Sequence, residues 1–197
     1  AYNMLDEQAI RRRKNEPVDD IPKGEFLMVS VGSLIPRKGF ERLIHICGLL
    51  KSRGYRFHLL ILGKGELYEQ LAEQVIDEHL LDSVQLLGFR DNPYPYMAAA
   101  DLYVCPSYVE GFSTVVSEAV VLETPVVTTD CSGMREILGD SEYGLITRNT
   151  EESLFEGLRT MLDKPEVYQY YQQRVRERAP FFYMEERLKA YEEILDQ

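Results

Sequence analysis

The sequence predicts an α/β fold built on a doubly wound, mostly parallel sheet of about six strands, with further helices toward the C-terminus. Short runs rich in valine, isoleucine and leucine alternate with longer helical patterns from residue 26 to about residue 150. The short runs are almost continuously apolar, which is typical of strands that are covered on both faces. Strand–helix–strand units of this spacing connect parallel strands through right-handed crossovers.

Six segments have the length and composition of strands. Each is short, rich in β-branched or other apolar residues, and separated from the next by a helical pattern or by turn residues. The predicted strands are FLMVSV (26–31), FHLLIL (57–62), VQLL (84–87), LYVC (102–105), PVVTT (125–129) and GLIT (144–147).

Helical patterns occupy the intervals between these strands. Residues 40–54 place leucine and isoleucine side chains along one side of a helix that closes at Gly54. Similar patterns cover residues 66–81 and 95–100. Ser113 is well suited to cap a further helix, because a serine hydroxyl can accept a hydrogen bond from a free amide of the first turn.

The two ends of the chain differ from this repeating pattern. After about residue 150 the pattern is helical only and predicts three helices broken near Pro165 and Pro180. The first 23 residues are charged and irregular. Their basic run RRRK at 11–14 is interpreted as a solvated helix face, with a membrane-surface patch as the alternative.

Composition excludes several functional classes. Lysine plus arginine is 22 and aspartate plus glutamate is 33, so the net charge is −11, which argues against an extended nucleic-acid surface while allowing a local basic pocket. The widely spaced Cys47, Cys105 and Cys131 have no metal-ligand rhythm and indicate buried, reduced thiols in a cytosolic protein. No apolar run reaches the roughly 18 residues of a membrane span, and the first residues lack the apolar stretch of a signal peptide.

Three predicted strands end in glycine, at Gly32, Gly63 and Gly88. Ligands of open α/β sheets bind outside the carboxyl ends of the strands, where glycine lets the backbone approach a ligand closely. Arg37 and Lys38 follow the first of these turns and suit a phosphate or diphosphate, although two solvated charges on an exposed loop are the alternative.

The segment EGFSTVVSEA places Glu110 in a loop and Glu118 about one and a half turns into the helix that Ser113 caps. Backbone amides of the first helical turn would bind an anion, and both carboxylates can accept hydrogen bonds from the hydroxyls of a ribose or hexose. Alternatively, Glu110 is loop surface and Glu118 is a salt-bridged helix residue.

Other catalytic patterns are absent from the sequence. GKGELY at 63–68 lacks the third glycine of a dinucleotide-binding loop, and no phosphate-binding P-loop motif occurs. His45, His58 and His79 are scattered, without the spacing of a serine hydrolase or a zinc site. We therefore expect no metal and no cofactor.

Taken together, these segments resemble the C-terminal, donor-binding half of a retaining glycosyltransferase of family 4, which has the GT-B fold. The resemblance runs in order along nearly the whole chain, and EGFSTVVSE matches the paired-glutamate motif of that family. The other matching segments are YNMLD, VGSLIPRKGFERLI, ILGKGELYEQL, VQLLGFRDNPYPYMAAADLYVCPSYVEGF and EAVVLETPVVTTDCSGMREIL.

The resemblance implies a role for each matching residue. Glu118 would bind the ribose of a nucleotide sugar, Glu110 would contact the transferred sugar, and Lys38 would hold the diphosphate. The remaining implied donor-binding residues are Gly32 and Gly63 under the ligand, Phe89 and Arg90 beside the base, and Gly111, Phe112, Ser113, Thr114 and Val115, which would bind through backbone amides beside the sugar and the diphosphate.

One position departs from the family pattern. Many members have an arginine directly after the glycine of the first turn, where it joins the lysine on the diphosphate. This chain has Ser33 there. We hypothesise that Arg37 takes the place of the missing cation.

The resemblance also implies an organisation and a setting. Residues 1–23 would be a linker from a missing N-terminal domain, residues 24–180 the nucleotide-sugar-binding domain, and residues 181–197 a helix that packs back on the missing domain. A sugar or lipid-linked acceptor would bind that domain, so this chain alone would be inactive. The expected setting is cytoplasmic, at the membrane face where the full-length protein associates peripherally, in polysaccharide or glycolipid synthesis.

Other functional classes stay open at this point. A non-catalytic nucleotide-binding module would keep the fold and lose the chemistry. A GT-B-like nucleotide-sugar epimerase would change the sugar without an acceptor. A phosphorylase is disfavoured because the lysine context that pyridoxal phosphate requires is absent.

Overall fold

The computed structural model describes residues 5–183 and contains one six-stranded sheet in the order β3-β2-β1-β4-β5-β6. Every neighbouring pair of strands is parallel. The strands are β1 (Phe26–Val31), β2 (Phe57–Leu62), β3 (Val84–Gly88), β4 (Leu102–Cys105), β5 (Val126–Thr129) and β6 (Leu145–Thr147). The α/β class and all six predicted strands are confirmed.

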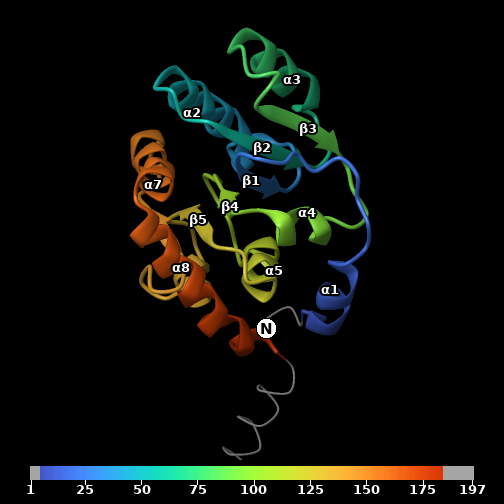
Figure 1. Cartoon of the computed structure of the whole chain (residues 1–197), viewed down its shortest axis with the longest axis vertical. Helices are drawn as coiled ribbons and strands as arrows, with labels where there is room; N and C mark the ends of the chain where they lie inside the picture. Colours follow the sequence, from blue (N-terminus) through green and yellow to red (C-terminus); the bar gives the residue numbers. More distant parts are fainter. Residues whose placement is uncertain (1–4, 184–197) are drawn as a thin grey trace, which may run out of the picture.

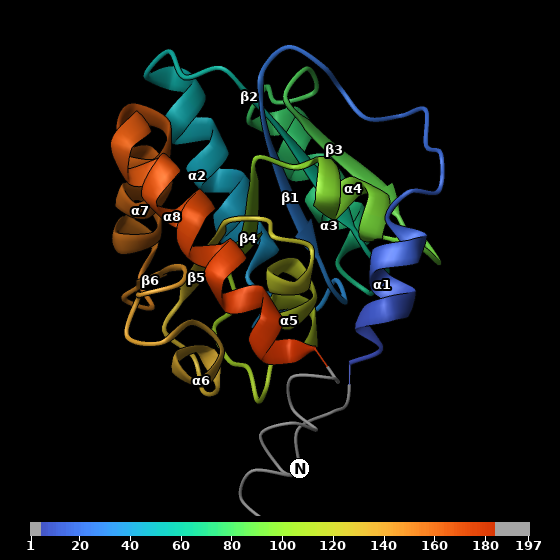
Figure 2. The same ribbon diagram turned by 60° about the horizontal axis from the view of Figure 1, so that its bottom comes forward.

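The strand order reverses at the centre of the sheet. From β1 the chain moves outward through β2 and β3, then returns to place β4 on the other side of β1, where Met28 lies beside Leu102 and Val29 beside Tyr103. The loops that leave β1 and β4 therefore depart in opposite directions and leave a crevice at the carboxyl edge. Figures 1 and 2 show β1 and β4 side by side in the middle of the molecule.

Helices cover both faces of the sheet, as Figure 1 shows. Apolar side chains of strand and helix form a separate core on each face, because alternate residues of a strand point to opposite sides. One face is covered by α2 (Phe40–Ser52), α3 (Tyr68–Asp77) and α7 (Glu151–Asp163). The other is covered by α1 (Glu7–Arg13), α4 (Tyr94–Ala99), α5 (Thr114–Val121), α6 (Met134–Leu138) and the 3-10 helix η2 (Ala179–Phe182).

Helix α8 (Pro165–Arg178) joins the two cores. Its Tyr171 packs in the core under α2 and α7, whereas Val175, one turn later, packs in the core under α5. The breaks predicted at Pro165 and Pro180 are confirmed, since these prolines begin α8 and lie at the start of η2. The third predicted helix lies outside the described residues.

The N-terminal segment contains a helix where the sequence suggested irregular structure. Asp6 caps α1 by accepting a hydrogen bond from the Ala9 amide at 2.8 Å, and Ile10 is buried in the core of α4 and α5. Arg11 and Arg12 are exposed, in agreement with a solvated face for the basic run. A helix this short has little stability of its own, so α1 depends on the packing of Ile10 in the core. Composition does not reveal such a tertiary contact, and for that reason the sequence did not predict this helix.

Helix α6 also went unpredicted. It lies between Gly133 and Gly139, whose positive φ angles of 79° and 63° mark its two ends. Among residues 5–183, no helix is both long and apolar enough to cross a membrane.

Two glycines at the carboxyl edge differ in the room around them. A Cβ on Gly63 would lie 1.8 Å from the carbonyl oxygen of Gly32, whereas a Cβ on Gly32 would meet only side-chain atoms, the nearest at 3.6 Å. The turns after β1 and β2 therefore touch through backbone, and only position 63 requires glycine for this contact.

We expect Gly63→Ala to lower the free energy of unfolding by more than about 2 kcal/mol, because two backbone segments must separate. Gly32→Ala, on the neighbouring strand end, should cost less than about 1 kcal/mol. Urea denaturation of both variants measures the difference. Equal losses at the two positions would contradict this account of the turn contact.

Candidate functional site

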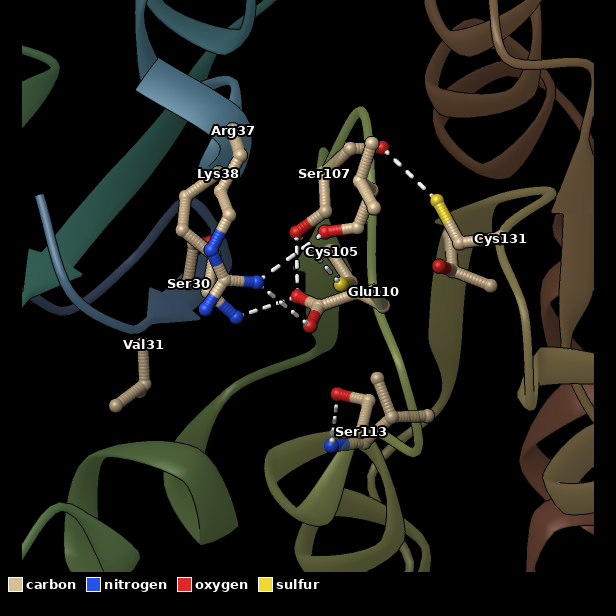
Figure 3. A network of polar contacts seen from close by, with 12 residues as sticks. Ser30, Val31, Arg37, Lys38, Cys105, Ser107, Glu110, Ser113 and Cys131 are labelled. Carbon is tan, nitrogen blue, oxygen red and sulfur yellow. Dashed lines mark hydrogen bonds and ion pairs between the residues drawn. The ribbon is translucent and has the colours of Figure 1, made fainter. Parts of the chain in front are cut away.

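Two loops at the carboxyl edge bring a lysine and a glutamate together. Lys38 ends the 3-10 helix η1 (Pro36–Lys38) after β1, and Glu110 lies in the loop between β4 and α5. The Lys38 Nζ lies 2.5 Å from Glu110 Oε1. Figure 3 shows the two side chains pointing toward each other.

The Glu110 carboxylate is buried and fully engaged. Its side chain is 6% exposed, Ser107 Oγ donates a hydrogen bond to Oε1 at 2.6 Å, and Arg37 Nη1 lies 3.7 Å from Oε2. Glu110 is therefore not a loop-surface residue. The cations compensate the lost hydration of the carboxylate, which is the condition for burying a charge.

The backbones of the same two loops are also in contact. The Tyr108 amide donates a hydrogen bond to the Arg37 carbonyl oxygen at 2.8 Å. Gly39 has a φ of +66°, and a Cβ there would lie 2.2 Å from the Pro106 carbonyl oxygen. Glycine is thus required at position 39, directly after Lys38, for the loops to approach this closely.

Helix α5 begins beside this pair. Ser113 is its N-cap and accepts a hydrogen bond from the Val116 amide at 3.4 Å, which confirms the predicted cap. Figure 3 shows Ser113 at the start of the helix, below Glu110 in that view. A small cavity of about 10 Å³, room for one water, is lined by Lys38, Glu110, Ser113 and Val115 among others.

A larger cleft of about 320 Å³ opens next to the small cavity, and Val115 lines both. Residues from the ends of β1, β2 and β3 form its walls together with the first turns of α5. The predicted site residues that line it are Gly32, Ser33, Gly63, Phe89, Arg90, Val115 and Glu118. Asp91, from the segment 88–92 that the family resemblance places against the base, lines it as well, and the residues that sequence reasoning did not assign to it are Val31, Leu62, Lys64 and Pro93.

Glu118 faces this cleft with a neutral partner. Tyr94 Oη donates a hydrogen bond to Glu118 Oε1 at 3.1 Å, and within residues 5–183 no ion pair includes Glu118. Burial raises the pKa of the Glu118 carboxyl, and the Tyr94 hydrogen bond only partly opposes this rise. Burial together with the nearby carboxylate raises the pKa of Tyr94 to about 12. The salt-bridge alternative for Glu118 is wrong.

The outer wall of the cleft is held by the N-terminal segment. Arg90 Nη2 lies 3.0 Å from Asp20 Oδ2, and Tyr96 Oη donates to Asp20 Oδ1 at 2.7 Å. The Tyr96 hydrogen bond, followed by Arg90, lowers the pKa of Asp20. Phe89 is 60% exposed, with Lys64 Nζ 4.8 Å from its ring centre.

Some predicted residues lie outside both cavities. Arg37 contacts Glu110 without lining either space, and Phe112 packs in the core beside α5. Gly111 and Thr114 also line neither cavity, although they flank Ser113 closely along the chain. The ligand-binding roles of all these residues stay predictions.

Sequence reasoning missed Ser107 and Tyr94. Ser107 precedes Glu110 by three residues, a spacing that could have suggested a local hydrogen bond. Tyr94 is 24 residues from Glu118, and nothing local indicates their contact. All three cysteines are free, but Cys131 is only half-buried, contrary to expectation. Among residues 5–183, no group of three or more His, Cys, Asp or Glu could hold a metal ion.

Known proteins resemble almost the whole chain. Residues 11–178 match the family described as Glycosyl transferases group 1. The N-acetylgalactosamine-N,N'-diacetylbacillosaminyl-diphospho-undecaprenol 4-alpha-N-acetylgalactosaminyltransferase of Campylobacter jejuni is 36% identical over 183 residues, which are 92% of this chain and 48% of that protein. The capsular polysaccharide biosynthesis glycosyltransferase CapM of Staphylococcus aureus is 28% identical over 82% of this chain and 41% of its own. The chain spans less than half the length of these curated relatives.

Solved glycosyltransferases share the fold. WaaG, involved in lipopolysaccharide biosynthesis, superposes with a TM-score of 0.73 at 26% identity, over 90% of this chain and 47% of its own. HepE of Anabaena, in complex with UDP, has a TM-score of 0.73 at 22% identity, over 88% of this chain and 49% of its own. S. aureus TarM, whose complex contains UDP, has a TM-score of 0.75 at 20% identity, over 92% of this chain and 38% of its own. The expected Rossmann-like unit of a GT-B fold is confirmed.

We expect Glu118→Gln to stabilise the ligand-free protein in a pH-dependent way. The folded-state pKa of Glu118 lies above its unfolded value, so stability falls as pH rises through that interval. A glutamine side chain does not titrate in this range, so it removes this loss of stability, and its carbonyl oxygen can still accept the hydrogen bond from Tyr94. The gain in Tm should be smallest at the acid end of the pH range and grow as pH rises.

Thermal unfolding from pH 4 to pH 8 measures this gain. Glu73→Gln, at an exposed position on α3, is the matched control and should show no pH-dependent gain. A constant offset between wild type and Glu118→Gln across the whole pH range would contradict the assigned pKa direction.

Proposed function

The chain belongs to the glycosyl transferases of group 1, and on that premise we propose that it is the donor-binding half of a retaining family 4 glycosyltransferase. It would bind a nucleotide-diphospho-sugar and transfer a hexose-type sugar to an acceptor held by an N-terminal domain. In this organisation residues 1–23 lead in from that domain, residues 24–180 bind the donor, and residues 181–197 return to it. The domain alone would not complete the transfer.

The Lys38–Glu110 pair is the observation that supports this proposal most. A cation and a carboxylate lie within 2.5 Å of each other at the carboxyl edge, beside the capped start of α5. An ammonium group and free helix amides suit a diphosphate, and a carboxylate suits sugar hydroxyls. In a nucleotide sugar the diphosphate is bonded directly to the transferred sugar. A cation that binds phosphate and a carboxylate that binds sugar hydroxyls would therefore be needed side by side.

The same residues can assist bond cleavage. When the bond between the anomeric carbon and the diphosphate oxygen breaks, negative charge develops on the diphosphate. Lys38 and the amides of Thr114 and Val115 would stabilise that charge, without a metal ion. Glu110 would orient the sugar so that the acceptor attacks the face from which the diphosphate departs. Donor binding requires Lys38 to share its contact with Glu110 between the carboxylate and the phosphate oxygens.

The larger cleft suits the nucleoside. Glu118, whose carboxylate accepts a hydrogen bond from Tyr94, would also accept hydrogen bonds from the ribose hydroxyls. The base would lie along Phe89 and Arg90 on the outer wall. The presence of UDP in the HepE and TarM complexes supports a nucleoside diphosphate as the leaving group and makes UDP the first ligand to test.

The names of the relatives support a place in glycan assembly. The C. jejuni relative is named for a diphospho-undecaprenol acceptor, and CapM for capsular polysaccharide biosynthesis. We infer that the full-length protein extends a polysaccharide or glycolipid on a sugar or lipid-linked acceptor. Its site would face the cytoplasm, at the membrane surface where such an acceptor is held.

We expect UDP or another nucleoside diphosphate to raise the Tm of the chain in a concentration-dependent way. Lys38→Ala should weaken this binding at least about tenfold, because a charge-assisted contact with the diphosphate is lost. Lys51→Ala, near the C-terminal end of α2 and paired with Asp82, is the matched control and should bind as the wild type does. Calorimetry with UDP, GDP, ADP and their sugars gives the affinities. No binding of any of them by the wild type would favour the non-catalytic module.

The Arg37 hypothesis has its own test. Arg37 lies 3.7 Å from Glu110 Oε2 and is 52% exposed, so its guanidinium can turn toward a bound diphosphate. Arg37→Ala should weaken nucleoside diphosphate binding about 3- to 10-fold, or roughly 1 kcal/mol, and leave binding of the unphosphorylated nucleoside unchanged. Equal diphosphate affinity in variant and parent would refute a second-cation role.

A further inference from the structure

Arg42 is a buried cation that forms no ion pair with an acidic side chain of residues 5–183. It lies in the first turn of α2, is 3% exposed, and takes part in none of the ion pairs found within residues 5–183. Burial accordingly lowers the pKa of its guanidinium. Burying a charge is costly unless other groups compensate it, so the groups that hold Arg42 indicate what it is for.

Neutral groups of the Glu110 loop hold the guanidinium. Arg42 Nε donates to the Pro106 carbonyl oxygen at 2.7 Å, and Nη2 donates to the Ser107 carbonyl oxygen at 2.7 Å. Nη2 also donates to Asn149 Oδ1 at 2.9 Å, and the guanidinium lies 3.8 Å from the centre of the Tyr108 ring. The fork of Arg42 thus fixes three consecutive residues of the loop.

Ser107 connects this guanidinium to Glu110. Its carbonyl oxygen accepts from Arg42, from Thr129 Oγ1 at 2.5 Å and from Cys131 Sγ at 3.2 Å, as Figure 3 shows for the thiol. Its hydroxyl donates to the Glu110 carboxylate at 2.6 Å. Ser107 therefore contacts the donors that hold the loop through its carbonyl oxygen, and the carboxylate that pairs with Lys38 through its hydroxyl.

Arg42 is tied equally closely to Lys38. Only three residues separate them, and Gly39 between them packs against the Pro106 carbonyl that Arg42 binds. Arg42 therefore links the segment that carries Lys38 to the segment that carries Glu110, in addition to the backbone hydrogen bond between Tyr108 and Arg37. The Lys38–Glu110 ion pair joins the same two segments directly.

We propose that Arg42 is a positioning residue that sets the Lys38–Glu110 geometry for the diphosphate and the transferred sugar, an inference that rests on the proposed function. Arginine suits this task because its planar fork binds two carbonyl oxygens while its face stacks on Tyr108. A lysine at position 42 would keep the charge but present its donors from one point, so the carbonyls of Pro106 and Ser107 would not both stay satisfied.

Variants of the full 197-residue chain test the coupling between Arg42 and Lys38. Arg42→Lys should weaken UDP binding about tenfold or more when Lys38 is present. In the Lys38→Ala background the same change should have almost no effect, because the geometry that Arg42 sets is no longer used. A residue that only stabilises the fold would instead give additive losses in the two backgrounds.

Two further variants separate positioning from general damage. Thr129→Val removes another donor to the Ser107 carbonyl and should weaken UDP binding in the same direction, about threefold, even if Arg42→Lys folds poorly. Arg53→Met, at the opposite end of α2 over the Phe155 ring, is the matched control and should leave affinity unchanged.

The outcomes distinguish this inference from the proposed function. Wild-type affinity in Arg42→Lys, or equal losses with and without Lys38, would overturn the positioning role while leaving donor binding intact. If Arg42→Lys does not fold, wild-type affinity in Thr129→Val overturns it. If the wild-type chain binds no nucleoside diphosphate, the proposed function fails and the inference fails with it.

Discussion

Burial of the Glu110 carboxylate is the constraint on which the carboxyl edge of this protein depends. A carboxylate that is 6% exposed requires a cation and a hydrogen-bond donor within reach. Lys38 comes from the loop after β1, and Ser107 comes from the loop after β4. The two loops can meet only because β1 and β4 are neighbours, where the order of the sheet reverses. The Lys38–Glu110 contact therefore depends on the order of the strands in the sheet.

Much of this arrangement could be predicted because its determinants are local. Strands buried on both faces are continuously apolar, so β1, β2 and β4 have the bounds that their sequences indicate. The Ser113 cap is likewise local. By contrast, Arg42 and Pro106 are 64 residues apart, and no periodicity connects them. Residues such as Arg42 and Tyr94 act through tertiary contacts, so their sequence positions resemble those of ordinary surface residues.

The three cations between residues 37 and 42 are graded from solvent to core. Arg37 is 52% exposed at its side chain, Lys38 17%, and Arg42 as a whole residue only 3%. Arg37 and Lys38 contact the Glu110 carboxylate, and an anionic ligand could compete with that carboxylate for them. Arg42 instead binds the buried backbone carbonyl oxygens of Pro106 and Ser107. In a chain of net charge −11, this loop junction therefore brings three positively charged side chains close together.

Glu110 and Glu118 meet the cost of burial in different ways. Glu110 has two cations and a serine hydroxyl, so its charge is compensated in the ligand-free protein. Among residues 5–183, Glu118 has only the Tyr94 hydroxyl as a partner of its carboxylate, and burial leaves its pKa raised. A carboxylate held in this state lowers stability. Under the proposed function, the hydroxyls of a ribose in the cleft that Glu118 faces would donate further hydrogen bonds to the carboxylate and so offset the cost of its burial.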